Sequence, residues 1–169
     1  MKIRSGFVSN SSSSSFLVAF DKRPKTSKKL QEMMFNKIEE RKDPYDDKKF
    51  YKTNEIAEQV FKDLKKQKPT TLKKAIEAVS CSWFSTRPKF ENYRIDKKAN
   101  DEGLKNYDMK AFNKDLLYKS TKVAEDFFEE NKGKKIYIFT YSDKDGDFFI
   151  FMEHGNIFKK LEHLRLSHH

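Results

Sequence analysis

The chain has 169 residues, which is enough for one domain with a hydrophobic core and too few for two domains of ordinary size. Lys and Arg outnumber Asp and Glu by 36 to 26, which gives a net charge of +10. The single cysteine excludes an internal disulfide framework and any zinc site built from several cysteines. No apolar run approaches the roughly 18 residues that a membrane span requires, and no signal-peptide core follows the basic N-terminal residues. We therefore expect a cytoplasmic protein without a membrane partner.

The positive charge is unevenly distributed along the chain. Residues 21–74 contain 17 Lys and Arg against 10 Asp and Glu, whereas residues 75–169 contain 17 against 16. A basic surface of this kind attracts nucleic acid or acidic partners without sequence specificity. A lysine-rich surface that is merely solvated has the same composition, so nucleic-acid binding is one of two interpretations.

A serine tract at residues 5–15 precedes the first apolar segment. Such a low-complexity tract is by itself typical of a flexible linker. It leads directly into residues 16–20, Phe-Leu-Val-Ala-Phe, whose continuous apolar character predicts a strand buried inside a sheet. Because one end of the tract is then fixed, we expect Ser9 to Ser15 to be ordered and hydrogen-bonded, with Asn10 turning the chain.

Three amphipathic segments follow, and their apolar residues recur with the helical period. The residues predicted to begin these helices are, in order, Thr26 or Ser27, Thr53-Asn54 and Pro69-Thr70-Thr71. A charged loop at residues 43–52 separates the first two helices. The apolar pattern of the third helix extends to Trp83, which places Cys81 on the buried side as a structural thiol.

The C-terminal part begins after an irregular loop at residues 85–107. Asp108 is expected to cap the longest helix, which ends at Gly133. Residues 136–141 and 148–152 indicate two strands, and the Asp-Gly-containing turn between them predicts a β-hairpin. Residues 164–166 are predicted to form a last short strand.

These elements predict a single α+β domain over residues 1–169, with a small, mainly antiparallel sheet. The N-terminal strand and the C-terminal hairpin form the sheet, and the long helix packs across it. The expected organisation is a serine-rich leader and core strand at residues 1–20, a basic helical insert and loop at 21–107, and the long helix, hairpin and histidine cluster at 108–169.

All four histidines fall within the last sixteen residues of the chain. If the strand at residues 16–20 pairs with the C-terminal strands, the serine tract and these histidines come together. The residues then predicted to bind a ligand are Ser9, Asn10, Ser11, Ser12, Ser13 and Arg165. The residues that could bind a divalent metal there are Glu153, His154, His163, His168 and His169.

Three kinds of chemistry fit this set of residues. Hydroxyls and a guanidinium bind phosphate oxygens, and His154 or His163 can act as a general acid or base, which describes a nucleotide-binding protein or a phosphate-directed hydrolase. Imidazoles with a carboxylate can hold a divalent metal, although the spacing matches no compact metal motif. Alternatively, the polar side chains only satisfy one another and lock the two ends together. In that case the domain would act by binding another protein.

The two ends also carry a resemblance. The opening K-I-R-S-G-F-V-S-N-S-S-S-S-S-F and the ending Y-S-D-x-D-G…E-H-G…H-x-R-x-S-H-H are similar to those of a set of uncharacterised bacterial and bacteriophage proteins. The opening match covers about the first twenty residues, and the ending match covers about the last thirty-five. The resemblance implies a phage or mobile-element accessory protein, with a host or phage protein as a partner, and implies no particular reaction.

Overall fold

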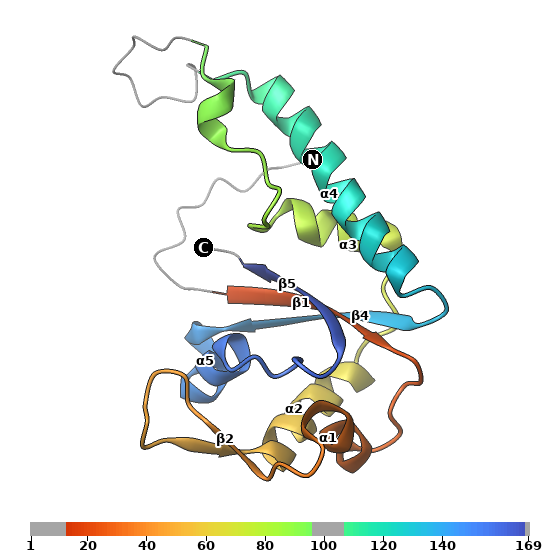
Figure 1. Ribbon diagram of the computed structural model, residues 1–169, viewed down its shortest axis with the longest axis vertical. Coiled ribbons are helices and arrows are strands. Elements are labelled where there is room, and N and C mark those ends of the chain that lie inside the picture. Colours follow the sequence, from red (N-terminus) through yellow and green to blue (C-terminus); the bar gives the residue numbers. More distant parts are fainter. Residues whose placement is uncertain (1–12, 96–106, 168–169) are drawn as a thin grey trace.

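The computed structural model describes residues 13–95 and 107–167 (Figure 1). The chain forms an α+β fold. Its elements are β1 (Ser13–Phe20), α1 (Ser27–Phe35), β2 (Glu40–Lys42), β3 (Phe50–Lys52), α2 (Thr53–Lys65), α3 (Leu72–Ser80), α4 (Met109–Glu130), β4 (Lys135–Ser142), α5 (Asp147–His154) and β5 (Glu162–Ser167). Short 3₁₀ turns lie at Phe90–Tyr93 and Asp143–Asp145. In the part of the chain that is described, no helix combines the length and the apolar character that crossing a membrane requires.

The main sheet has three antiparallel strands in the order β4-β1-β5. The N-terminal strand is therefore the central one, and both of its neighbours come from the C-terminal part of the chain. Phe16 lies opposite Phe139 on one side and opposite Arg165 on the other. The prediction that the apolar strand sits inside the sheet is confirmed.

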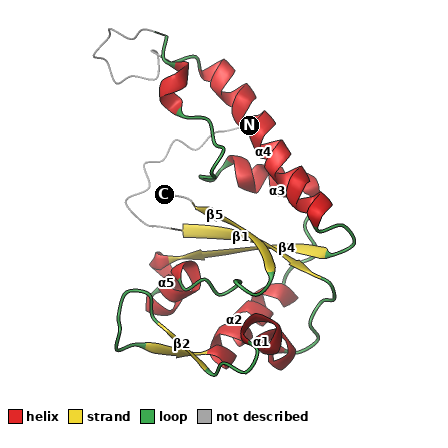
Figure 2. Cartoon of the chain, in the orientation of Figure 1, coloured by secondary structure: helices red, strands yellow, loops and turns green. Residues whose placement is uncertain are grey.

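Helices cover both faces of this sheet (Figure 2). Side chains alternate along a strand, so Phe16, Val18 and Phe20 point to one face and Leu17 and Ala19 to the other. The first set packs in a core with α1, α2 and α5, and the second set packs in a separate core with α3 and α4. Because both faces are buried, residues 16–20 of β1 have no polar side, and this explains their uninterrupted apolar sequence.

The starts of α1, α3 and α4 agree with the sequence patterns because short polar side chains cap these three helices. The Thr26 hydroxyl accepts a hydrogen bond from the Lys29 amide at 3.1 Å, and Thr71 caps α3 in the same way. The Asp108 carboxylate accepts from the Ala111 amide at 2.9 Å and begins α4. Each cap satisfies an amide that the first helical turn leaves without a partner.

The predicted C-terminal β-hairpin is wrong in its second strand. Residues 148–152 belong to α5, and β4 pairs with β1 instead. A run of five apolar residues fits a buried strand and a buried helix equally well, because it is too short to show a period. Packing decides the outcome, since Phe151 and Met152 are fully buried against the core that contains Phe16.

Two smaller predictions are also corrected. The charged segment after α1 contains the β2–β3 hairpin, whose Arg41 donates to the Gly155 carbonyl at 3.0 Å and so fastens the end of α5. Helix α3 ends at Ser80, so Cys81 is exposed and not a buried thiol. Trp83 lies beyond the helix in a β-bridge with Ser167.

Candidate functional site

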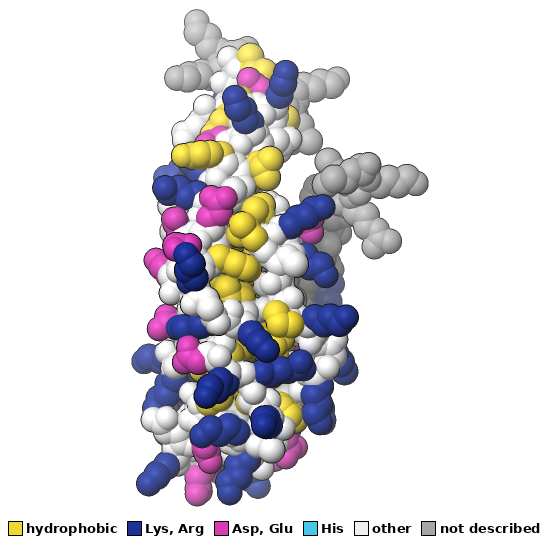
Figure 3. All heavy atoms as spheres, turned by 90° about the vertical axis from the view of Figure 1, so that its right-hand side faces the viewer, with side chains coloured by type: hydrophobic (Ala, Val, Ile, Leu, Met, Phe, Trp, Pro, Cys, Tyr) yellow, Lys and Arg dark blue, Asp and Glu magenta, His cyan; other side chains and the backbone are white. Residues whose placement is uncertain are grey.

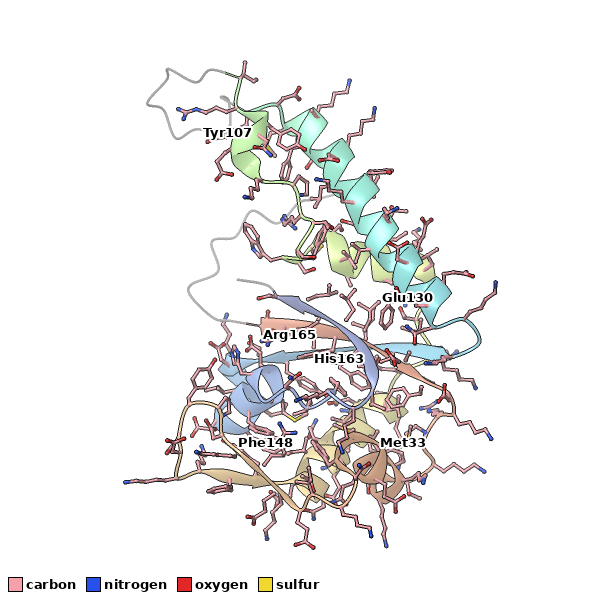
Figure 4. The ribbon with its side chains drawn as sticks, in the orientation of Figure 1. Met33, Tyr107, Glu130, Phe148, His163 and Arg165 are labelled. Carbon is pink, nitrogen blue, oxygen red and sulfur yellow. The ribbon has the colours of Figure 1, made fainter. Side chains whose placement is uncertain are left out.

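The central position of β1 brings four polar residues from the two ends of the chain together. Ser14 comes from β1, Glu153 and His154 from the last turn of α5, and Arg165 from β5. We call these residues the terminal cluster. Figure 4 labels Arg165 on β5, beside the end of β1. The expected meeting of the two ends is confirmed at Ser14, His154 and Arg165.

The inner half of the terminal cluster is closed to solvent. Ser14 and Glu153 are both 0% exposed. The Ser14 hydroxyl donates to Glu153 Oε1 at 3.4 Å and accepts from Arg165 Nε and Nη2 at 3.4 and 3.3 Å. A carboxylate removed from water is tolerated only when hydrogen bonds and opposite charge replace its hydration. Ser14 therefore links the buried acid to the guanidinium.

His154 completes the cluster with both of its ring nitrogens. Arg165 Nη2 lies 3.3 Å from Nδ1, and because a guanidinium can only donate, Nδ1 accepts. This assigns the proton of the neutral ring to Nε2, which lies 3.4 Å from Glu153 Oε1. The ring of Tyr45, from the loop between β2 and β3, packs edge-on against the imidazole at 5.3 Å between centroids. A histidine held on both nitrogens is positioned, but neither nitrogen is free to take a proton from a substrate.

The other predicted site residues have different positions. His163 lies two residues before Arg165 on the same strand, and its Nδ1 is 2.9 Å from the Leu161 carbonyl oxygen. Ser13 begins β1 opposite Ser142. The remaining predicted residues, Ser9, Asn10, Ser11, Ser12, His168 and His169, lie outside the described residues. Within the described ranges, no group of three or more His, Cys, Asp or Glu side chains is arranged to hold a metal ion. A metal site that includes the last two histidines stays a prediction.

A shallow hollow of about 520 Å³ adjoins the exposed side of Arg165. It is lined by Trp83, Phe84, Ser85, Arg165 and Ser167, and we call it the Trp83 hollow. The Trp83 amide donates to the Ser167 carbonyl at 2.6 Å, which adds one residue to the edge of β5. Bridged residues on neighbouring strands share a face, so the Trp83 side chain stands on the same face of the sheet as Ser167 and Arg165.

Trp83 is unusual because the only tryptophan of the chain is 59% exposed. The guanidinium of Arg87 lies 5.1 Å from the centre of its ring and donates to the Ser80 carbonyl at 3.1 Å. Burial lowers the pKa of the Arg87 guanidinium from its ordinary value. The indole is thus held against one cation, and a second, Arg165, lines the same hollow. The sequence did not predict Trp83 as a site residue, because the apolar pattern of the third helix extends past the true end of α3 and places Trp83 in the helix.

No family model, curated protein or solved structure matches the chain. The resemblance of the two ends to bacterial and bacteriophage proteins therefore stays a prediction. The functional proposal below depends on the geometry of the terminal cluster and of the Trp83 hollow.

Proposed function

We propose that the protein binds a nucleotide, free or as one unit of a nucleic acid, in the Trp83 hollow. The observation that carries this proposal is an exposed indole that shares one hollow with the exposed guanidinium of Arg165. A nucleotide consists of a flat base and an anionic phosphate, so it needs these two kinds of partner side by side. The proposal retains the accessory role that the resemblance implies and adds a ligand class to it.

Each residue of the hollow has a distinct role in this binding. The base stacks on Trp83, since indole rings accept any base and each stacked base contributes about 1–3 kcal/mol. Arg165 grips the phosphate, because its planar guanidinium offers several N–H groups in a fixed geometry. Its Nε and Nη2 hold Ser14 and His154, while Nη1 makes no hydrogen bond within the described part of the chain. The hydroxyl of exposed Ser85 adds a further donor.

The role of the terminal cluster in this function is to fix Arg165 and not to hydrolyse the ligand. His154 is engaged through both ring nitrogens, and Glu153 is buried. Neither group can reach a phosphate in the hollow without breaking the cluster. We therefore propose binding without catalysis by these two residues.

A second candidate function uses the same geometry without a small ligand. The complete burial of Ser14 and Glu153 favours a purely structural lock between the two ends. In that case Trp83 and Arg165 form part of a surface for a host or phage protein, because exposed tryptophan and arginine are enriched among residues that dominate protein interfaces. The two candidates differ in one measurable way, since only the first requires nucleotides to bind to the isolated protein.

Tryptophan fluorescence tests the first candidate directly, because Trp83 is the only tryptophan. Titration with a nucleoside monophosphate and with a short single-stranded oligonucleotide should quench the emission, and the nucleoside without phosphate should bind more weakly. Arg165→Met should weaken nucleotide binding by about 10- to 150-fold, as expected for the loss of one charge-assisted contact of about 1.5–3 kcal/mol. Lys68→Met is the matched control, since this exposed lysine lies outside the hollow.

Because Arg165 also belongs to the terminal cluster, its variant is compared with Trp83→Ala by calorimetry, and thermal unfolding confirms that both are folded. Trp83→Ala should also weaken binding, by about tenfold or more for a stacked base. Nucleotide binding that is equal in wild type and both variants would show that the hollow is not the site. Absence of binding by any nucleotide at low salt would leave the structural lock as the better explanation.

A further inference from the structure

A second hollow lies on the opposite face of the sheet from the terminal cluster. It has a volume of about 640 Å³, which is within the range of small-molecule sites. It is formed by the segment before α3, the last turns of α4 and the start of β4, and we call it the α4 hollow. Its lining residues are Pro69, Thr70, Leu72, Glu125, Asp126, Phe128, Glu129, Asn131, Lys132, Gly133, Lys134, Lys135 and Ile136. Figure 4 labels Glu130 at this end of α4, beside the turn that leads to β4.

Two polar atoms in the wall of this hollow lack a hydrogen-bond partner in the described part of the chain. Asn131 is only 3% exposed, and its amide nitrogen donates to the Phe127 carbonyl at 3.0 Å, but its Oδ1 accepts no hydrogen bond. Thr70 Oγ1 is also unpaired, although the Thr70 amide donates to the Ile136 carbonyl at 2.7 Å. Buried polar groups are nearly always paired, so two unpaired oxygens lining one hollow indicate a missing partner. Both oxygens are shielded from solvent, so a ligand can pair with them only if neighbouring side chains move.

The C-terminal end of α4 favours a positively charged partner in the α4 hollow, although the acidic side chains Glu125, Asp126 and Glu129 are matched in number by Lys132, Lys134 and Lys135. The C-terminal end of a helix carries partial negative charge, and the last turn of α4 contains no basic residue. Glu125, Asp126 and Glu129 lie there as well. Lys132 pairs with Glu129 at 3.2 Å, whereas within the described residues no ion pair engages Glu125 or Asp126.

Part of the wall is apolar, and this part limits the kind of cation that fits. Leu72, Phe128 and Ile136 line the hollow beside the polar groups. Figure 3 looks onto this side of the molecule, where hydrophobic side chains run down the middle of the face and Lys and Arg predominate over its lower half. A metal ion would leave the apolar wall unused. An amine with a hydrocarbon body matches both parts of the hollow.

We propose that the α4 hollow binds a small primary amine with an aromatic or aliphatic body. The ammonium group lies near Glu125, Asp126 and the end of α4 and donates to Asn131 Oδ1 and Thr70 Oγ1. The hydrocarbon part packs on Leu72, Phe128 and Ile136. This site is separate from the Trp83 hollow and does not depend on the nucleotide proposal.

The test compares three probes with the same phenylethyl body and head groups of different charge, which are 2-phenylethylamine, 2-phenylethanol and 3-phenylpropanoate. Amide chemical shifts in the full chain locate the binding, and their concentration dependence gives the dissociation constant. A ligand of this size binds a small site with a dissociation constant of about 1 mM. The amine should bind more tightly than the alcohol and the acid, with shifts at residues 69–72 and 125–136.

Substitutions separate the contribution of the carboxylates to amine binding from the contribution of the unpaired oxygens. Replacing Glu125 by Gln and Asp126 by Asn together should weaken amine binding by about threefold for each carboxylate, a typical effect of an exposed ion pair. Thr70→Val keeps the shape of the side chain and should also weaken the amine while leaving the alcohol less affected. Glu58→Gln, on the exposed surface of α2, is the charge control and should have no effect. Equal affinity for amine, alcohol and acid, or shifts elsewhere in the protein, would overturn the proposal.

Discussion

The replacement Ser14→Ala tests how strongly the terminal cluster stabilises the fold. It removes the hydroxyl that donates to Glu153 Oε1 at 3.4 Å and accepts from Arg165. Water can replace Ser14 as a partner of exposed Arg165, but it cannot reach Glu153, which is 0% exposed. The loss of folding free energy in Ser14→Ala therefore comes mainly from the buried Glu153 carboxylate, which loses one hydrogen-bond donor, and such a loss is about 1–3 kcal/mol. The 3.4 Å distance is long for a hydrogen bond between oxygens, so we expect a value near 1–2 kcal/mol.

Thermal unfolding followed by circular dichroism at pH 7 measures this effect. A chain of this length loses about 2–4 °C of Tm for each kcal/mol, so Ser14→Ala should lower Tm by about 2–8 °C. Ser80→Ala is the matched control, because the Ser80 hydroxyl donates to the Glu77 carbonyl on the exposed side of α3 and its loss should change Tm little. In the double variant with Glu153→Gln, the two effects should be less than additive, since they act on one interaction. A Tm for Ser14→Ala within 1 °C of wild type would refute the assignment of Ser14 as the link between the buried acid and Arg165.

Three further predictions concern pH and packing. Burial raises the pKa of the Tyr141 hydroxyl well above its ordinary value of 10.0, so above pH 10 the unfolded chain releases a proton that the folded chain retains, and unfolding is favoured. Urea midpoints of wild type should therefore fall above pH 10, and those of Tyr141→Phe should fall less. The hydrogen bond from Lys49 lowers the pKa of Asp147 below its ordinary 3.8, so the stabilising effect of ionised Asp147 is present above pH 3.8 and is lost as the pH falls through the lower, folded-state pKa. Urea midpoints of Asp147→Asn should therefore fall less than those of wild type as the solution is acidified below pH 5. An identical fall would contradict this. A Cβ at Gly155 would lie 2.6 Å from the Phe151 carbonyl oxygen, so Gly155→Ala should destabilise the protein by about 1–3 kcal/mol, and an unchanged urea midpoint would show that α5 shifts freely.

The sequence predicts those parts of the fold that local side chains determine. Thr26, Thr71 and Asp108 cap their helices through hydrogen bonds to amides within three residues, so the signal and its cause lie in the same short segment. The buried strand at residues 16–20 is equally visible, because a strand covered on both faces has no polar positions. These predictions needed no knowledge of distant neighbours.

The parts that the sequence did not predict are decided by packing between distant segments. Phe148 to Met152 form a helix that packs in the core with Phe16, and β4 pairs with β1, a strand more than a hundred positions earlier in the chain. The end of α3 at Ser80 has no glycine or proline to mark it, and the bridge between Trp83 and Ser167 draws the chain out of the helix. The Trp83 hollow was missed for this reason, whereas the meeting of the serine tract with Arg165 followed from the position predicted for the strand at residues 16–20.

The central position of β1 has a consequence for how the protein is made. Ser14 and Glu153 are 139 residues apart, and at about 5–20 residues per second a ribosome needs about 7–28 s to synthesise the chain between them. For most of that time the apolar segment Phe16–Phe20 has been synthesised, but neither of its partner strands has. A nascent chain in this state exposes two unpaired strand edges, which favours aggregation and recognition by chaperones. A chain truncated before β5 should therefore be insoluble, whereas a released chain that extends to Ser167 should fold.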